Sequence, residues 1–413
     1  MFSTLKGMFY MEFQSQSFLP VAFGGDINTY SVARAFYEAY RVKTRVYGKF
    51  PTGPSYNSKI TIYEDNTKMD QPEVMLPILK DLAAKNKKKK ILAIGCGDSY
   101  VATLSQIKDQ LPENVIAPYI DFDLMDSLQQ KERFYQLCDK HGIDHPATVI
   151  FRKGMDPNME LPFRFPIILK PSNGIAYWEH PFDTQEKVYT IRNREELAKV
   201  SEEIFEAGYE DSLILQDMIP GNDEFMRVLT CYSNHTGHVK MMCLGHVLLE
   251  EHTPHGKGNH AVIITELKSD LYDRVKALLE DLSYVGFSNF DIKYDRRDGK
   301  YKFFEINTRQ GRSNFYVTGS GLNIAKLLVE EYILDHPLEF ITPKEERLWL
   351  TVPKGVARKY IFEEENVAKL HKLLKQKKYV NPIFLKGDNG LNRMLRMWKN
   401  HFNQYKNFKR YYS

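Results

Sequence analysis

The sequence has few cysteines and no long apolar run, and each absence excludes a class of protein. Its four cysteines, Cys96, Cys138, Cys231 and Cys243, lie far apart and form no CxxC pair. We therefore expect neither a disulfide framework nor a zinc site, and a reducing cytoplasm fits best. No stretch approaches the roughly 20 apolar residues of a membrane span, and the first residues lack the pattern of a secretion signal. We expect neither an integral membrane protein nor a secreted one.

Apolar and aromatic residues are plentiful in this chain of 413 residues. Hydrophobic residues make up 43% of it, with 25 Tyr and 25 Phe. This composition argues against a disordered or coiled-coil protein. Because a typical domain has about 150 residues, we expect two or three domains.

Charge is distributed unevenly along the chain. The formal net charge is +4, but residues 341–413 hold 17 Lys and Arg against 6 Asp and Glu, a net charge of +11, which leaves −7 for residues 1–340. Uniform positive charge would favour a nucleic-acid partner, which we do not expect here. A basic end rich in Tyr, Phe and Trp fits an anionic membrane surface equally well.

Alternating strands and helices predict an open α/β domain over residues 1–122. Residues 18–25 have the pattern of a strand ending in a glycine turn, and residues 26–40 that of a helix capped by Asp26 or Thr29. Residues 91–110 repeat this unit, and residues 117–121 are expected as a further strand. Neither glycine turn has the full GxGxxG of a dinucleotide site, so simple strand-to-helix turns are favoured.

Longer strands with polar alternation predict an α+β region over residues 123–340, followed by a basic extension over 341–413. A helix at 124–142 comes first, and the strands that follow have an antiparallel pattern. Residues 288–314 contain a clear hairpin, in which two alternating runs are joined by DRRDG. A helix over residues 321–333 comes next.

The hairpin carries the residue pattern that is most informative about chemistry. Asp291 lies on its first strand, and Glu305 and Asn307 lie two residues apart, hence on one face, of its second strand. Oxygen ligands of this kind suit Mg²⁺, although an exposed polar face is the alternative. Arg309 and Arg312 follow directly and could hold a carboxylate or a developing acyl phosphate.

Two upstream segments are candidates for binding a nucleotide. Lys170 ends an apolar strand before a PSNG turn, where a lysine can serve a phosphate, or can simply reach solvent from a sheet edge. Further on, LILQDMIPGNDEF is a plausible slot for adenine and ribose. Backbone groups of residues 217–219 would face the purine, and Asp223 or Glu224 the ribose hydroxyls.

The order of these elements resembles that of the ATP-grasp superfamily. A pre-domain with glycine turns precedes a helix lysine in DSLQQKERFYQLC, the strand lysine in FPIILKP, the hinge QDMIPGNDE, and DIKYD…FFEINTRQGR. The resemblance implies ATP and Mg²⁺ as cofactors, with Lys131 and Lys170 on the phosphates and Glu224 on the ribose. It implies adenine binding by Gln216, Asp217, Met218 and Ile219, and metal binding by Asp291, Glu305 and Asn307.

A closer resemblance covers most of residues 15–340. FLPVAFGGDINTYSVARAFYEAY, AIGCGDSYV, PYIDFDLMDSLQQKERFYQLC and NFDIKYD…FEINTRQGRSNFY are similar to segments of the D-aspartate ligases of cell-wall synthesis. That resemblance implies an amide-forming ligase in which a substrate carboxylate attacks the γ-phosphate of ATP and an amine then displaces phosphate. D-aspartate and the lysine of a peptidoglycan precursor would be the substrates. The alternatives are a ligase for another acid and amine, or a non-catalytic nucleotide sensor.

Two loops and one helix complete the expectations. Phosphoryl transfer to a carboxylate requires exclusion of water, and residues 172–182 and 252–261 are candidate mobile covers. Lys257 and His260 in the second loop could touch phosphate or acid, although Lys257 could instead be solvated. Beyond GDNG, an amphipathic helix is expected, with Leu391, Met394, Leu395, Trp398, Phe402 and Tyr405 on one side. This helix either packs on the body, which we favour, or lies on an anionic membrane surface.

Overall fold

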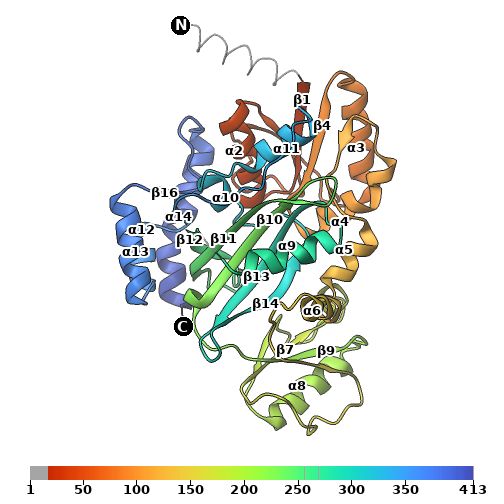
Figure 1. The fold of residues 1–413 in the computed structure, drawn as a ribbon, viewed down its shortest axis with the longest axis vertical. Coiled ribbons are helices and arrows are strands. Elements are labelled where there is room, and N and C mark those ends of the chain that lie inside the picture. Colours follow the sequence, from red (N-terminus) through yellow and green to blue (C-terminus); the bar gives the residue numbers. More distant parts are fainter. Residues whose placement is uncertain (1–16, 255, 268, 413) are drawn as a thin grey trace. The chain divides into compact units, whose positions relative to one another are not determined.

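The computed structural model describes residues 17–254, 256–267 and 269–412 (Figure 1). The chain divides into two compact units. Of the described residues, the larger unit comprises those up to Met125, those within Asp223–Phe290 and those from Asn307 onward, and the smaller unit comprises Asp126–Asn222 and Asp291–Ile306. The extension expected at 341–413 is therefore part of the larger unit. None of the helices described is long and apolar enough to cross a membrane.

A five-stranded parallel sheet opens the larger unit and confirms the expected α/β pattern. Its strand order is β3-β2-β1-β4-β5. The elements are β1 (Phe18–Phe23), α2 (Ile27–Tyr40), β2 (Thr44–Gly48), β3 (Thr61–Asp65), α3 (Pro72–Lys85), β4 (Lys90–Gly95), α4 (Asp98–Ile107), η1 (Lys108–Gln110), β5 (Val115–Ile116) and α5 (Phe122–Gln129). The strand expected at 117–121 is wrong, because pairing with β4 stops at Ile116.

The two glycine turns follow neighbouring strands of this sheet. β1 and β4 pair in parallel from Phe18↔Lys90 to Phe23↔Gly95, so both strands end at the same edge. Asp26 caps α2 by accepting a hydrogen bond from Asn28 N at 2.9 Å. Gly24 has a φ of +146°, and a Cβ there would lie 2.4 Å from Thr29 Oγ1, so only glycine fits this turn.

A second sheet has seven strands in the order β14-β13-β10-β11-β12-β15-β16, and β10, β11, β12, β15 and β16 form the centre of the larger unit. β10 and β11 are antiparallel, as are β11 and β12, which confirms the expected antiparallel pattern of these strands. The elements are η2 (Asp223–Phe225), β10 (Met226–Ser233), β11 (Val239–Glu250), β12 (His260–Glu266), α9 (Leu271–Asp281), β13 (Gly286–Asp295), β14 (Lys300–Asn307), α10 (Phe315–Gly319), α11 (Ile324–Tyr332), β15 (Leu348–Leu350) and β16 (Tyr379–Val380). β13 carries the chain into the smaller unit and β14 brings it back.

One apolar core joins the two sheets of the larger unit. Phe18 and Phe36 of the parallel sheet and its helix belong to the same buried cluster as Tyr232, Met241 and Tyr316 of the central region. Burying side chains of this size stabilises a fold by about 2 kcal/mol each. The α/β pre-domain is therefore not an independent core within this unit.

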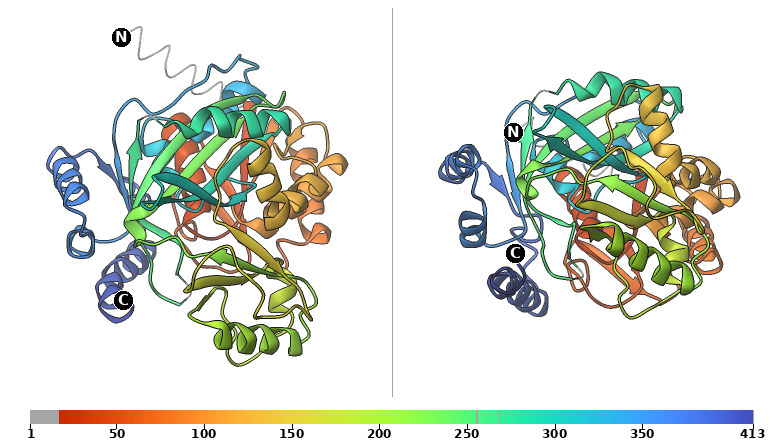
Figure 2. Two further views of the ribbon diagram at one scale, coloured as in Figure 1. Left: turned by 60° about the horizontal axis from the view of Figure 1, so that its bottom comes forward. Right: turned by 90° about the horizontal axis from the view of Figure 1, so that it is seen from below.

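The basic extension adds helices to the far edge of the central sheet. α12 (Lys354–Tyr360), α13 (Glu364–Lys375) and α14 (Leu391–Tyr411) are drawn in blue beside β12 in Figure 1 and again at one side of the larger unit in Figure 2. Val356, Leu370 and Phe408 from these helices share a buried cluster with Leu248 and Val262 of β11 and β12. The extension is thus packed on the body.

The smaller unit is built on a four-stranded sheet in the order β6-β9-β7-β8. Its elements are α6 (Lys131–Lys140), β6 (Thr148–Phe151), β7 (Ile167–Pro171), α7 (Gly174–Trp178), β8 (Tyr189–Ile191), α8 (Arg194–Glu206) and β9 (Leu213–Asp217). Its core includes Ile167, Leu197 and Leu215. The single helix expected at 124–142 is wrong, because the chain breaks at Gln130 into α5 and α6.

Candidate functional site

Three predicted site residues lie together in the smaller unit. Lys131 is the first residue of α6, Lys170 lies near the end of β7, and Glu305 lies on β14. Lys131 Nζ is 3.1 Å from Glu305 Oε2. Lys170 Nζ stands 5.7 Å from the ring centroid of Phe304, and its charge acts on Glu305 as well. The break before α6 places Lys131 at this point.

This cluster brings two lysine side chains close together around one carboxylate, an arrangement that favours binding of a further negative charge. Burial, with the neighbouring Lys131 cation, lowers the pKa of Lys170 to about 7. Lys131 in turn holds the pKa of Glu305 well below its ordinary value. Both lysines act on the same carboxylate, so a polyanion brought to this cluster would relieve the repulsion between them.

The predicted adenine segment runs along the last residues of β9. Gln216 is buried, and its Nε2 donates to Tyr135 Oη at 2.7 Å and to Thr148 Oγ1 at 3.0 Å. Asp217 N donates to Ala147 O at 2.9 Å. Met218 and Ile219 follow outside the strand, half-buried and buried respectively. The backbone after Asp217 is therefore free of the β6–β9 ladder, as purine recognition by main-chain groups requires.

Arg297, in the hairpin turn, was not among the predicted residues. It donates to both oxygens of Asp217, at 3.2 and 2.5 Å, and to both oxygens of Asp295. Hydrogen bonding to Arg297 lowers the pKa of Asp295. The DRRDG turn was visible in the sequence, but nothing in it indicated that its arginine fixes the end of β9.

The three predicted metal ligands lie on neighbouring strands. Asp291 is on β13, and Glu305 and Asn307 are on β14. Asn307 Nδ2 donates to Asn289 O at 3.4 Å, and its Oδ1 accepts from Arg309 at 3.4 Å. Across the described residues, no group of three or more His, Cys, Asp and Glu side chains could hold a metal ion. Metal binding by this set, which includes an amide, stays a prediction.

In the larger unit, the two predicted arginines meet the glycine turns of the parallel sheet. Arg309 binds Asp98, at the start of α4, through Nε and Nη2 at 2.6 and 3.1 Å. Arg312 lies 3.8 Å from Asp26 and 3.5 Å from Glu251. The structure therefore brings the arginines together with carboxylates that stand up to about 290 residues away in sequence, as counted along the chain.

Amide side chains hold the arginine segment in place. Gln310 Nε2 donates to Gly95 O at 2.9 Å, and Asn314 Nδ2 donates to Asn28 Oδ1 at 2.8 Å. Gln310 and Asn314 are fully buried. Strands β1 and β4 end in this region, and the next strands, β2 and β5, lie on opposite sides of this pair. In open α/β sheets, small ligands bind at such a position.

Glu224, predicted to hold ribose, makes contacts within the larger unit. Its Oε1 accepts from Phe362 N at 2.8 Å, and its Oε2 accepts from Glu363 N at 3.1 Å and from Asn366 Nδ2 at 2.8 Å. These donors lie at the start of α13, where a carboxylate is favourable. The structure thus gives Glu224 a role in fixing α13, and its ribose role stays a prediction.

Two buried histidines lie near these residues. His246 was not among the predicted residues, whereas His260 was expected to touch phosphate or acid, which stays a prediction. His246 Nε2 lies 2.7 Å from Glu224 O, and His260 Nδ1 lies 3.2 Å from Ser313 Oγ. Burial lowers the pKa of His246 to about 3 and that of His260 to about 4. A strand pattern shows which residues alternate, but it does not show which polar side chains the rest of the fold will bury.

Comparison with known proteins agrees with this architecture. No protein family model matches the sequence. The D-aspartate ligase of Enterococcus faecium (strain Aus0004) is 39% identical over 411 residues, which cover 97% of this chain and 98% of that protein.

Solved structures share the fold at low identity. The L-amino acid ligase from Bacillus licheniformis has a TM-score of 0.51 and 15% identity, over 78% of this chain and 75% of that one. The ADP complex of PurK, an N5-carboxyaminoimidazole ribonucleotide synthetase, has a TM-score of 0.58 and 13% identity, over 94% and 98%. These neighbours confirm the mixed α/β and α+β ATP-grasp fold, and the near full-length match shows that the chain belongs to the D-aspartate ligase family.

Proposed function

We propose that this chain is an ATP-dependent ligase that joins the side-chain carboxylate of D-aspartate to the side-chain amine of a lysine in a peptidoglycan precursor. The observation that carries the proposal is the cluster of Lys131, Lys170 and Glu305, which occurs in a chain 39% identical to a D-aspartate ligase over nearly its whole length. Retention of both lysines and the carboxylate favours catalysis over simple nucleotide sensing.

The residues present fit ATP and Mg²⁺. Lys131 and Lys170 would neutralise the phosphates, and residues 216–219 would face the adenine. Asp291, Glu305 and Asn307 offer oxygen ligands on adjacent strands, the donor type that Mg²⁺ prefers. Bound there, Mg²⁺ would supply positive charge to the transferring phosphoryl group. Ribose binding by Glu224 would have to share oxygens that already accept hydrogen bonds.

The chemistry assigned to the arginines is binding of the acid. A substrate carboxylate attacks the γ-phosphate of ATP, which gives an acyl phosphate and ADP, and the amine then displaces phosphate to form the amide. Arg309 and Arg312 would hold the carboxylate and then the acyl phosphate through paired donors. Asp98, Asp26 and Glu251 keep both guanidinium groups oriented. The same carboxylates would attract the ammonium group of an amino acid, which makes this region suited to a zwitterion.

Water must be kept from the acyl phosphate. Residues 172–182 and 252–261 remain our candidates for covers, and the first contains the short helix α7. Lys257 is exposed in the second segment. We place the reaction in the reducing cytoplasm, where free cysteines persist, and all four cysteines of this chain are free and buried.

The proposal is tested by turnover on defined substrates. The protein is incubated with ATP, Mg²⁺, D-aspartate and a muropeptide precursor that contains lysine, and ADP and phosphate are measured. Release should require both the acid and the amine, and L-aspartate should replace D-aspartate poorly. A panel of other acids and amines identifies a different ligase specificity. ATP binding without turnover on any of them would instead establish a nucleotide sensor.

A further inference from the structure

An apolar stripe on α14 faces solvent. Its members are Leu391, Leu395, Trp398, Phe402 and Tyr405, whose exposed fractions are 73%, 62%, 42%, 57% and 47%. At about 100° per residue, they fall within an arc of about 80°. The expected packing of this helix on the body is confirmed: Met397 and Phe408 are buried on another side, and Trp398 of the stripe stacks on Phe384. Much of the apolar surface of the stripe nevertheless stays exposed.

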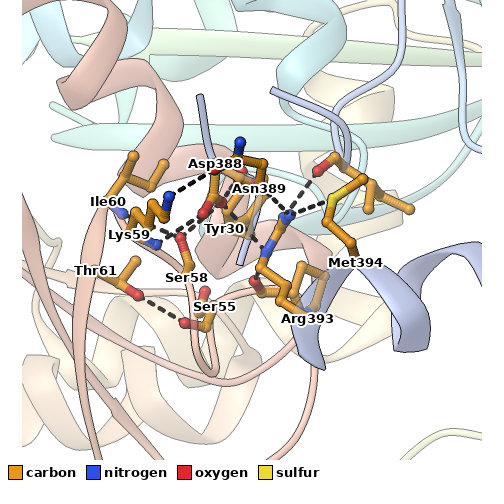
Figure 3. Close-up of polar contacts among 12 residues, drawn as sticks. Tyr30, Ser55, Ser58, Lys59, Ile60, Thr61, Asp388, Asn389, Arg393 and Met394 are labelled. Atoms are coloured by element: carbon orange, nitrogen blue, oxygen red, sulfur yellow. Dashed lines mark hydrogen bonds and ion pairs between the residues drawn. The ribbon is translucent and has the colours of Figure 1, made fainter. Parts of the chain in front are cut away.

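A buried network holds α14 in this orientation. Arg393 Nε lies 3.3 Å from Asp388 Oδ2, and both side chains have no exposed surface. Tyr30 Oη and Ser58 Oγ donate to the same carboxylate at 2.6 and 2.8 Å (Figure 3). Arg393 Nε also donates to Pro54 O at 2.8 Å. The start of the helix is therefore fixed to the α/β region of the larger unit. Because these contacts set the rotation of α14 about its axis, they also keep the stripe exposed.

Basic residues border the stripe on the side away from the anchor. Lys399, Lys406, Lys409 and Arg410 are exposed, and residues 391–411 contain no Asp or Glu. The aromatic members are stacked: Trp398 lies 5.5 Å from Phe402 and 4.4 Å from Phe384, between ring centroids. Such a surface joins apolar side chains, amphipathic aromatic rings and positive charge along one helix.

We propose that α14 docks the enzyme on the surface of an anionic lipid bilayer, with the stripe in the headgroup region and the basic residues against lipid phosphates. Aromatic rings with basic neighbours are typical of helices that lie in this interface. The +11 charge of residues 341–413 complements an anionic surface, while the −7 of the remainder does not. A second copy fits less well, since two such helices would bring like charges together.

This proposal does not depend on the ligase assignment, and it is tested by sedimentation with vesicles. The full chain should bind phosphatidylcholine vesicles that contain phosphatidylglycerol, and should not bind vesicles of phosphatidylcholine alone. Added salt should release it, because the surface charge is screened. Trp398 fluorescence should shift to shorter wavelength on binding, measured in Trp178→Phe so that the other exposed indole does not contribute.

Matched variants locate the binding surface. Trp398→Ser with Phe402→Ser should weaken binding at least tenfold, and Lys399→Glu with Lys406→Glu should weaken binding and reduce its salt dependence. Phe340→Ser, a control at a phenylalanine that is 43% exposed elsewhere, should change nothing. Absence of binding by the folded full chain, or equal binding by the stripe variant, overturns the proposal. So does a lipid-free dimer that the stripe substitutions dissociate, because the stripe would then be a self-association surface.

Discussion

At the scale of single residues, burial and the neighbouring Lys131 lower the pKa of Lys170, whereas the carboxylate of Glu305 raises it. A lysine whose pKa is about 7 is close to half protonated at neutral pH, and bound phosphates would stabilise its cationic form. Nucleotide binding should therefore take up a proton near pH 8. As pH rises above about 7, affinity should fall, since the free protein must first be protonated.

Lys170→Met tests this linkage by calorimetry of ATP binding in two buffers of different ionisation enthalpy. The native chain should take up close to one proton at pH 8, and the variant should lose both that uptake and at least tenfold in affinity. Lys199→Met, at a 75% exposed lysine of the same unit, is the control. If Lys170→Met takes up as many protons as the native chain, Lys170 does not bind the phosphates, and the alternative of a lysine that reaches solvent from a sheet edge is favoured.

Glu305 is the residue on which the metal assignment depends most. Glu305→Gln keeps the size of the side chain but removes its charge, so we expect turnover to fall by orders of magnitude with an unchanged circular dichroism spectrum. Asn307→Ala should act in the same direction. Glu195→Gln, on the exposed face of α8, should retain full activity. A folded Glu305→Gln enzyme with near-normal turnover would exclude this carboxylate from the reaction.

What the sequence reveals at this scale depends on distance along the chain. Lys170 and Glu305 end or interrupt apolar strands, so their exceptional chemistry was visible locally. The partners of Arg309 and Arg312 were not, because Asp98 lies 211 residues from Arg309 and only the fold brings them together. Glu224 was predicted to bind ribose because it is an acidic residue in a turn before a strand. The same carboxylate can accept hydrogen bonds from the start of a helix, and it does so at α13.

At the scale of elements, α14 shows how an amphipathic pattern can mislead. The pattern predicted the helix, which is confirmed, but not which side would be buried. The anchoring residue is Arg393, a charged side chain with no exposed surface, whose partner Asp388 precedes the helix. Strands and the hairpin were easier to predict, because period-two alternation and a DG turn have few other structural solutions.

The anchor of α14 makes a prediction about stability. Arg393→Met leaves Asp388 buried without its cation, and removal of one partner from such a pair costs about 3 kcal/mol. We expect the urea midpoint of the variant to fall accordingly, with an unchanged slope. Lys399→Met, on the exposed part of the same helix, should unfold like the native chain. A loss below about 0.5 kcal/mol would show that the network does not support the helix.

At the scale of the whole molecule, the larger unit should be sensitive to acid. His246 and His260 stay neutral in the folded protein down to pKa values of about 3 and 4. In the unfolded chain a histidine takes up its proton near pH 6.5. The unfolded state therefore binds more protons between these limits, and stability should fall as pH drops from about 6.5 towards 4.

Urea unfolding measured against pH checks this effect. Each histidine should account for about 3 kcal/mol of the loss by pH 4, at 1.36 kcal/mol for each pKa unit. His260→Asn and His246→Gln should flatten the curve, whereas a change at His371, an exposed histidine of α13, should not. Parallel curves for native and variant proteins would show that other groups govern acid unfolding.

The two-unit division was the least predictable property at this scale. The sequence order implied three consecutive parts, but β13 and β14 cross into the smaller unit and back, and the C-terminal helices complete the core of the larger one. The division of the chain into these two units depends on contacts between segments that are distant in sequence, and local sequence patterns do not indicate such contacts. Fold class was accessible, because parallel and antiparallel strands differ in their apolar patterns.

The central claim is that an acyl phosphate links ATP cleavage to amide formation. It is tested most directly with D-aspartate labelled with ¹⁸O in its side-chain carboxylate, incubated with ATP, Mg²⁺ and the lysine-containing precursor. Attack of the carboxylate on the γ-phosphate leaves one labelled oxygen in the phosphate that the amine later displaces. We expect each inorganic phosphate to carry one ¹⁸O atom from the acid, seen by mass spectrometry. Unlabelled phosphate, formed while the amide accumulates, would contradict the account.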